Sequence, residues 1–193
     1  MTIQNQDDEV IQVPLRDGSV AEMRPVNPGD KELLVEGLSQ MSPQSRRARF
    51  GSGISALSAS ELRYLTDVNQ VSHVAWGATI DDDPAGIGRY IVDGADAEIA
   101  ITVVDRFQRR GLGRAIFEAL AATGRAAGIE TFHFVVEPWN RPVLHMLAGI
   151  EVVEDGDGML TGRIGVADIP RGAREAEFVE LLDRDRQRMA GPV

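Results

Sequence analysis

The feature that most constrains the fold is a predicted buried strand that leads through a glycine-containing loop directly into a helix. Residues 99–104 form an apolar run typical of a strand, and residues 115–127 are strong helix formers. Residues 131–136 predict a further strand. Because a helical crossover joins strands that run parallel in one sheet, the chain is expected to contain a parallel pair.

The loop between the first strand and the helix predicts an anion site. The first N–H groups of a helix lack intrahelical partners, and the helix dipole favours negative charge beside them. Gly111 and Gly113 let the main chain approach a phosphate without a side chain in the way. Positive charge is added by Arg109, Arg110 and Arg114. We expect the loop to hold a phosphorylated cofactor; a plain turn that binds nothing is the alternative.

Two common phosphate motifs do not fit this loop. The Walker pattern requires Lys and then Ser or Thr after its last glycine, where this chain has Arg114 and Ala115. The dinucleotide fingerprint requires Gly or Ala three positions after the second glycine, where this chain has Ile116. Neither a P-loop nucleotide nor a dinucleotide is therefore the expected ligand.

The sequence Gln-x-x-Gly-x-Gly after an apolar strand closely resembles the pyrophosphate loop of the GNAT superfamily, the acyl-coenzyme A-dependent N-acyltransferases. The order of strand, loop, helix, strand and a helix begun by Asn140 resembles that superfamily over residues 72–150, whereas the flanks match poorly. The resemblance implies acetyl-CoA (acyl-CoA) as co-substrate. It also implies cofactor contacts from Val103, Val104, Gln108, Arg109, Arg110, Gly111, Leu112, Gly113, Arg114 and Asn140. For Asn140, a plain helix N-cap is a compatible alternative.

Acylation of an amine requires a base, because a lysine side chain has a pKa of ~10.4 and must lose a proton before or during attack. Glu98 opens the apolar strand that leads to the loop, and burial there would raise its pKa. The resemblance implies that a glutamate near this position acts as the base, often through water. The alternative is a strand-end glutamate in solvent beside Asp96.

His73 is the second catalytic candidate. The sequence Leu65-Thr66-Asp67, a short gap and His73-Val74-Ala75 resembles bacterial protein acyltransferases that acylate lysines on metabolic enzymes. His73 is expected to position substrate or assist proton transfer, with a purely structural histidine as the alternative. His133 and His145 are interpreted as structural, and the three histidines are too scattered for a metal site, so no metal is expected.

Two absences shape the expected mechanism. Many GNAT enzymes carry a Tyr seven residues after the Asn, as the acid that protonates the leaving thiolate, and this chain has Leu147 there. The thiolate is then expected to leave unaided or with another donor. The chain contains no cysteine, which excludes an acyl-cysteine intermediate and favours direct transfer in a ternary complex.

Composition places limits on class and partners. With 193 residues, 43% of them apolar and 26% charged, the chain is an ordinary globular domain with no stretch long enough to span a membrane. A net charge of −10 argues against nucleic acid as a partner. The same charge would steer a cationic substrate, although solubility alone explains it equally well. The polar, acidic start of the chain is no secretory signal, so a cytoplasmic protein is expected.

The expected fold is α+β, with a single mixed, mostly antiparallel sheet and helices on both faces, as in the GNAT fold. A flexible tail is predicted at 1–9, the acyltransferase domain at 10–170 and a charged helix with a tail at 171–193. Within the domain the predicted strands lie at 10–15, 19–24, 73–80, 85–92, 97–104, 131–136, 151–153 and 159–166. Helices are predicted from 28 to 38, from 43, from 58 to 65 and from 115 to 127, with Asp30 as the first N-cap.

The predicted activity is transfer of an acetyl or short acyl group to an amine, with lysine on a protein as the leading acceptor. A small-molecule amine or antibiotic is the second acceptor class. A sensor that binds acyl-CoA without catalysis is the alternative outside enzymes. The sequence fixes neither the acceptor, the preferred acyl length nor the oligomeric state.

Overall fold

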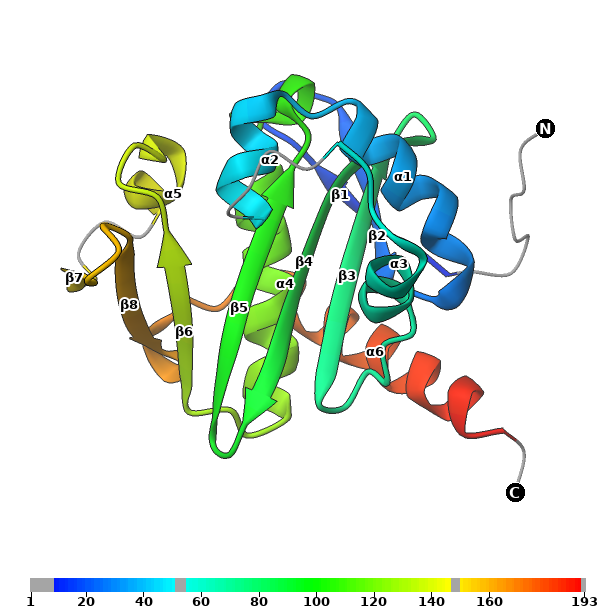
Figure 1. Ribbon diagram of the computed structural model, residues 1–193. Helices are drawn as coiled ribbons and strands as arrows, with labels where there is room; N and C mark the ends of the chain where they lie inside the picture. Colours follow the sequence, from blue (N-terminus) through cyan, green and yellow to red (C-terminus); the bar gives the residue numbers. More distant parts are fainter. Residues whose placement is uncertain (1–8, 51–54, 147–149, 192–193) are drawn as a thin grey trace.

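The computed structural model describes residues 9–50, 55–146 and 150–191, and these form one eight-stranded sheet with helices on both faces (Figure 1). Neighbouring strands follow the order β1-β2-β3-β4-β5-β6-β8-β7. The strands are β1 (Ile11–Pro14), β2 (Val20–Pro25), β3 (His73–Ile80), β4 (Asp83–Asp93), β5 (Asp96–Val103), β6 (Thr131–Val136), β7 (Val152–Glu154) and β8 (Leu160–Gly165). Within the described residues every strand pair is antiparallel except β5 with β6, which confirms the expected mixed sheet.

The helices divide between the two faces of the sheet. The α-helices are α1 (Lys31–Ser39), α2 (Pro43–Phe50), α3 (Ala59–Thr66), α4 (Leu112–Ala126), α5 (Arg141–Met146) and α6 (Glu175–Ala190). Single 3-10 turns lie at η1 (Pro28–Asp30), η2 (Asp105–Phe107) and η3 (Val166–Asp168). Helices α4 and α6 pack together on one face, and α1, α2 and α3 lie on the other (Figure 1). No helix in the described ranges combines the length and apolar character that crossing a bilayer requires.

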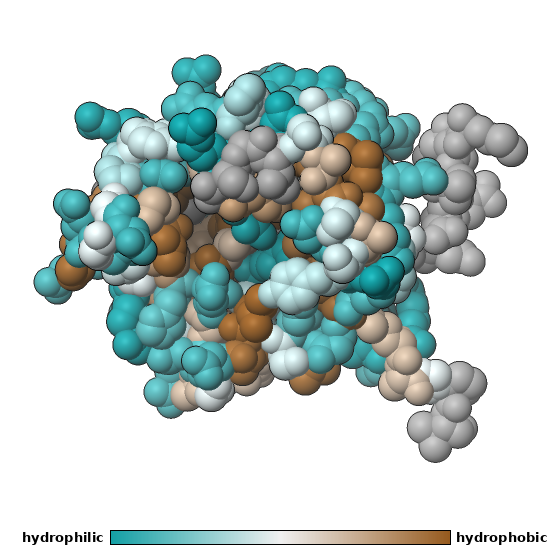
Figure 2. Space-filling model, in the orientation of Figure 1, coloured by the Kyte–Doolittle hydropathy of each residue, from teal (hydrophilic) through white to brown (hydrophobic). Residues whose placement is uncertain are grey.

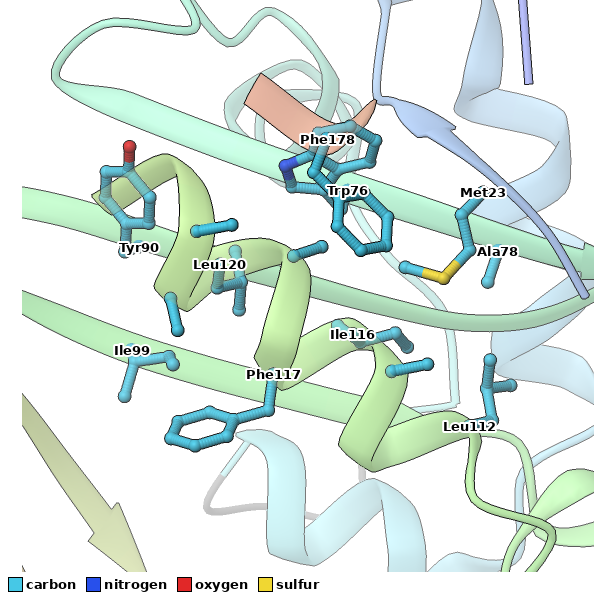
Figure 3. Close-up of a cluster of buried hydrophobic side chains, with 14 of the residues drawn as sticks. Met23, Trp76, Ala78, Tyr90, Ile99, Leu112, Ile116, Phe117, Leu120 and Phe178 are labelled. Carbon is cyan, nitrogen blue, oxygen red and sulfur yellow. The ribbon is translucent and has the colours of Figure 1, made fainter. Parts of the chain in front are cut away.

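Helix α4 packs closely against the centre of the sheet. Leu112, Ile116 and Leu120 recur at the four-residue spacing of one helical face, and all three are buried (Figure 3). Gly88 of β4 makes the approach possible, because a Cβ there would lie 2.3 Å from Ile116 Cγ2. Beside this contact Phe178 of α6 packs edge-on against Trp76 at 5.2 Å between ring centroids (Figure 3).

Helix α2 is tied to the segment that follows β5. The carboxylate of Asp105 accepts hydrogen bonds from the Ser42 backbone N–H at 2.9 Å and from the Ser45 hydroxyl at 2.8 Å. These contacts join residues about 60 positions apart in sequence. They fix the first turn of α2 over the end of β5, on the face opposite α4.

Two helix starts differ from the sequence prediction. Helix α4 begins at Leu112 rather than Ala115, because Gly111 adopts a left-handed φ of 100° and serves as the N-cap. Asp30 makes no cap bond to α1. Instead, the Asn27 side chain caps η1 through the Gly29 N–H at 2.8 Å, and the Asp30 carboxylate accepts from Arg24 at 2.9 Å.

The two ends of the described chain meet at α6. Residues 1–8 of the predicted tail lie outside the described residues, but Glu9 pairs with Arg184 of α6 at 3.0 Å and with Arg188 at 3.6 Å. The predicted charged helix begins at Glu175 rather than Arg171. Glu175 pairs with Arg125 of α4 at 2.7 Å, which anchors α6 to the body.

Candidate functional site

The central feature of the site is a break in the hydrogen-bond ladder between β5 and β6. The two strands pair only at Asp96–Thr131, Ala97–Phe132 and Glu98–His133. Beyond this point they diverge, although β5 continues to Val103 and β6 to Val136 (Figure 1). In the same orientation Figure 2 shows the surface hollowed beside these diverging strands, with apolar side chains in the hollow.

The backbone of Val103 faces this gap. The Val104 N–H donates a hydrogen bond to the carbonyl of Ala85 in β4, at 2.9 Å. Successive residues of a strand bond to opposite sides, so the N–H of Val103 points away from β4 and toward β6. Val104 therefore has no N–H to offer a ligand, whereas Val103 has.

The predicted phosphate loop lies at the open end of the gap. Ala115 donates the first intrahelical bond of α4, to the Gly111 carbonyl at 3.1 Å, so the three preceding N–H groups have no helical partner. A Cβ on Gly113 would lie 3.6 Å from Val103 Cγ2, which shows that loop and β5 are in contact. The start of a fifteen-residue helix thus adjoins the free edge of β5.

The three loop arginines differ in what they contact. Arg114 pairs with Glu118 of its own helix at 3.0 Å. Arg110 pairs with Asp17 at 3.1 Å and donates to the Arg106 carbonyl at 2.7 Å. Arg109 is exposed, holds a left-handed φ of 63°, and has neither hydrogen bond nor ion pair within the described part of the chain. Its guanidinium is therefore free to meet an anion.

Two other predicted loop residues have structural contacts. The Gln108 side-chain amide donates to the Val103 carbonyl at 3.0 Å, so it ties the loop to the end of β5. The Leu112 side chain is 1% exposed and belongs to the core, so only its backbone faces the loop. Both residues shape the site from within the protein.

Arg16 is a contact of the loop that the sequence does not indicate. Its backbone N–H donates to the Arg110 carbonyl at 3.0 Å, and its Cγ lies 3.5 Å from where a Cβ on Gly111 would stand. The β1–β2 turn thereby brings a further cation to the loop. Nothing in the local sequence beyond the Asp17-Gly18 turn signals this, because the two segments lie far apart along the chain.

Glu98 lies on the face of the sheet opposite α4, and its side chain is exposed, so the expected burial of its carboxylate is wrong. In register it stands beside Ile91 of β4, which stands beside His73 of β3. Glu98 and His73 therefore share one row across the sheet but are two strand spacings apart, about 10 Å. The structure does not bring the two candidate catalytic residues into contact.

His73 is half-buried, and its Nε2 has no hydrogen-bond partner. The ring lies 5.3 Å from that of Tyr64, centroid to centroid. Burial and the neighbouring charge of Arg89 lower the pKa of His73 from 6.5 to about 4. The imidazole is therefore neutral at pH 7 and a weak proton acceptor, which favours positioning over a role as base.

Asn140 immediately precedes α5, and its carbonyl accepts the Leu144 N–H at 3.1 Å. Its side-chain amide makes no hydrogen bond within the described ranges, so it remains available to a ligand. Leu147, which replaces the expected tyrosine, lies outside the described residues. His133 pairs with Asp96 at 2.9 Å, as a structural histidine would.

A cavity of about 70 Å³ adjoins β4 and β5 on the face covered by α1 and α2. Its walls are mainly apolar, and it is lined by two arginines, Arg49 and Arg89, together with Thr102 and Val104. Neither arginine is among the site residues predicted from the sequence. In the described residues no group of three or more His, Cys, Asp or Glu side chains is placed to hold a metal ion.

Comparison with known proteins gives a consistent set of relatives. A family model described as acetyltransferase (GNAT) family matches residues 44–149. The acetyltransferase Pat of Mycolicibacterium smegmatis is 29% identical over 191 residues, which cover 92% of this chain and 55% of that protein. The acetyltransferase PA5475 of Pseudomonas aeruginosa is 26% identical over 149 residues, 74% of this chain and 80% of that one.

Among solved structures, the GNAT domain of S. lividans PAT superposes with a TM-score of 0.75 at 32% identity. That match covers 81% of this chain and 96% of the domain. By contrast, the chain spans only about half the length of the first curated relative, the mycobacterial Pat.

Proposed function

The chain belongs to the acetyltransferase (GNAT) family, and we propose that it transfers an acetyl or short acyl group from acyl-CoA to an amine. The observation that carries this proposal is the break between β5 and β6, which ends at a helix N-terminus with free N–H groups. A ligand with a pyrophosphate at one end and a thioester at the other fits that arrangement. The helix start would bind the phosphates, and the gap would hold the acyl end.

The residues that would hold acyl-CoA are the loop around Gly111 and Gly113, the guanidinium of Arg109 and the side chain of Asn140. The pyrophosphate loop contributes mainly backbone N–H groups, since Arg110 and Arg114 are already paired with carboxylates. Gln108 would act indirectly, because its amide holds the Val103 carbonyl. Arg16 adds positive charge beside Gly111.

In the transfer step the Val103 N–H stabilises the negative charge that develops on the thioester oxygen, as an oxyanion hole does. Glu98 accepts the proton of the attacking amine through a water, which its exposed position permits. The nitrogen–carbon bond forms as the carbon–sulfur bond breaks, and the thiolate takes a proton from solvent. Both substrates are bound together, because no cysteine is present to carry the acyl group.

The acceptor we propose is lysine on a protein. The segment from Leu65 to Ala75 is similar to that of bacterial protein acyltransferases, and two relatives carry the names Pat and PAT. The net charge of −10 supports attraction of a cationic acceptor.

The direct test measures thiol release from acetyl-CoA with lysine peptides, small amines and no acceptor, using the full chain. Acetylated lysine identified by mass spectrometry, together with release above the no-acceptor rate, is the expected result. Release only with small amines would replace the lysine acceptor. Binding of coenzyme A without release from any acceptor would instead identify a sensor.

A further inference from the structure

Two arginines line the cavity beside β4 and β5 without a hydrogen-bonded or ion-paired partner among the described residues. Arg89 is 4% exposed, and its Nη1 has no hydrogen-bond partner. Within the described residues neither Arg89 nor Arg49 forms a hydrogen bond or an ion pair. The remaining lining is mainly apolar, with Thr102 as a polar neighbour. Arg49 lies 5.2 Å from the centroid of the Phe50 ring and is attracted by the charge of Glu98, but no described carboxylate forms an ion pair with either guanidinium. The cavity therefore presents two guanidinium groups that can still bind an anion.

This arrangement is costly for the protein alone. A buried charge without a paired group is unfavourable, and two like charges oppose each other further. Burial and the charge of Arg49 lower the pKa of Arg89 to about 9, and burial lowers that of Arg49. A pKa of about 9 leaves the Arg89 guanidinium charged at neutral pH. An anion that enters the cavity would relieve this cost.

The register places the cavity beside the proposed reaction centre. Arg89 stands opposite Ala75 on β3 and Ala100 on β5, whose small side chains leave room around the guanidinium. Along β5, Ala100 lies on the same face as Glu98, two residues or about 7 Å away. Thr102 and Val104, which also line the cavity, flank Val103. An anion held here would lie within a few bonds of the reacting carbonyl or amine.

We propose that Arg89 and Arg49 bind a carboxylate carried by one of the two substrates. A cavity of about 70 Å³ accommodates a few heavy atoms, and guanidinium groups bind carboxylates with charge-assisted, bidentate hydrogen bonds. The carboxylate belongs either to the acyl group of a dicarboxylic acyl thioester or to the acceptor amine. This inference deepens the proposed function and rests on it.

The experiment has two arms, each built on a matched pair. The donor arm compares succinyl-CoA with butyryl-CoA at a fixed lysine-peptide acceptor. The acceptor arm compares Nα-acetyl-lysine with Nα-acetyl-lysinamide at fixed acetyl-CoA, so the attacking amine is the same. We expect kcat/KM to favour the carboxylate by about tenfold or more in one arm, and that arm identifies its source.

The variants test the residues. Arg89→Gln is expected to abolish the preference, Arg89→Lys to retain part of it, and Arg63→Gln on the exposed surface of α3 to leave it unchanged. If Arg89→Gln does not fold, Arg49→Gln is tested in its place and is expected to weaken the same preference. Rates within threefold in both arms of the parent protein would overturn the proposal without any variant.

A binding readout separates this inference from the proposed function. Thermal unfolding is measured with each donor alone, and with each acceptor in the presence of coenzyme A. At equal concentration, the ligand that binds the folded protein more tightly raises the melting temperature further. Absence of thiol release from every donor would refute the proposed function. In that case a larger shift from the carboxylate member of either pair would still support the subsite, and equal shifts in both pairs would overturn it.

Discussion

The side-chain amide of Gln108 donates a 3.0 Å hydrogen bond to the carbonyl of Val103. One residue thereby links the loop that would bind pyrophosphate to the strand end that would bind the thioester. The same amide lies 3.5 Å from the Ser45 hydroxyl of α2. Together with Asp105, which accepts hydrogen bonds from Ser42 and Ser45, this side chain sets the relative position of the three segments around the proposed site.

Replacing Gln108 by Ala is expected to raise the KM for acetyl-CoA about fivefold. Loss of one such hydrogen bond costs about 1 kcal/mol, and here the loss misplaces both ends of the site. Steady-state kinetics measure the change, with Gln12→Ala on the exposed edge of β1 as the matched control. A KM equal to that of the control would show that the link is dispensable.

Replacing Gly113 by Asp is expected to abolish the rise in melting temperature that coenzyme A produces in the parent protein. The variant is expected to fold, because a Cβ at Gly113 meets only Val103 Cγ2 at 3.6 Å. Its carboxylate would place negative charge against the phosphates. Gly156→Asp, at a position with open space, is the control and should retain the shift. An unchanged shift in Gly113→Asp would refute the loop assignment.

Replacing Glu98 by Gln is expected to lower kcat by ~10²–10⁴-fold with little change in coenzyme A affinity, as for loss of a general base. The amide keeps the size of the side chain but accepts no proton. Glu154→Gln, on exposed β7, controls for loss of one surface charge. If Glu98→Gln turns over like the parent, the base is another residue, and His73 is tested next.

Initial-rate kinetics are expected to show a sequential mechanism. Lines of reciprocal rate against reciprocal acetyl-CoA concentration should intersect as the acceptor is varied, because no nucleophile is evident to hold the acyl group between half-reactions. Parallel lines, or an acylated protein that passes its acyl group to the acceptor, would contradict direct transfer.

His73 is expected to make folding stability depend on pH between 6.5 and 4. Its pKa falls from 6.5 to about 4 in the folded state, so the unfolded state binds the proton more readily in that range. The contribution is fully present above pH 6.5 and is lost as pH falls toward 4. His73→Asn should flatten this part of the profile in urea unfolding, whereas exposed His145→Asn should not. Parallel profiles for the parent and His73→Asn would contradict the assignment.

Much of the fold is predictable because its strands are short apolar runs bounded by turn residues. The prediction for 73–80 matches β3, and that for 131–136 matches β6. The connection between the predicted strands at 73–80 and 85–92 is shorter in the structure, since only Asp81 and Asp82 lie between β3 and β4, both with positive φ, and β4 begins at Asp83. Element boundaries differ from the prediction where the backbone conformation of one residue sets them. The left-handed Gly111, for example, starts α4 three residues before the predicted start.

The candidate site was only partly predictable, because its decisive contacts join distant segments. The phosphate loop and Glu98 could be predicted because each is recognisable from a short stretch of sequence. The exposure of Glu98, however, depends on which elements cover that face of the sheet. The contact of Arg16 with Gly111 and the convergence of Arg49 with Arg89 arise only when the sheet has formed. No periodicity or spacing in the sequence encodes them.

The break between β5 and β6 gives an interior strand the chemistry of an edge. Past Glu98, β5 presents unpaired main-chain groups in the middle of the sheet, where a free edge ordinarily invites pairing with another chain. Here β6 pairs with β5 only as far as Glu98 and diverges from it beyond that point (Figure 1). A ligand with its own amide donors and acceptors can form hydrogen bonds with these unpaired groups of β5. Such a ligand would occupy the place of the missing strand partner in the sheet.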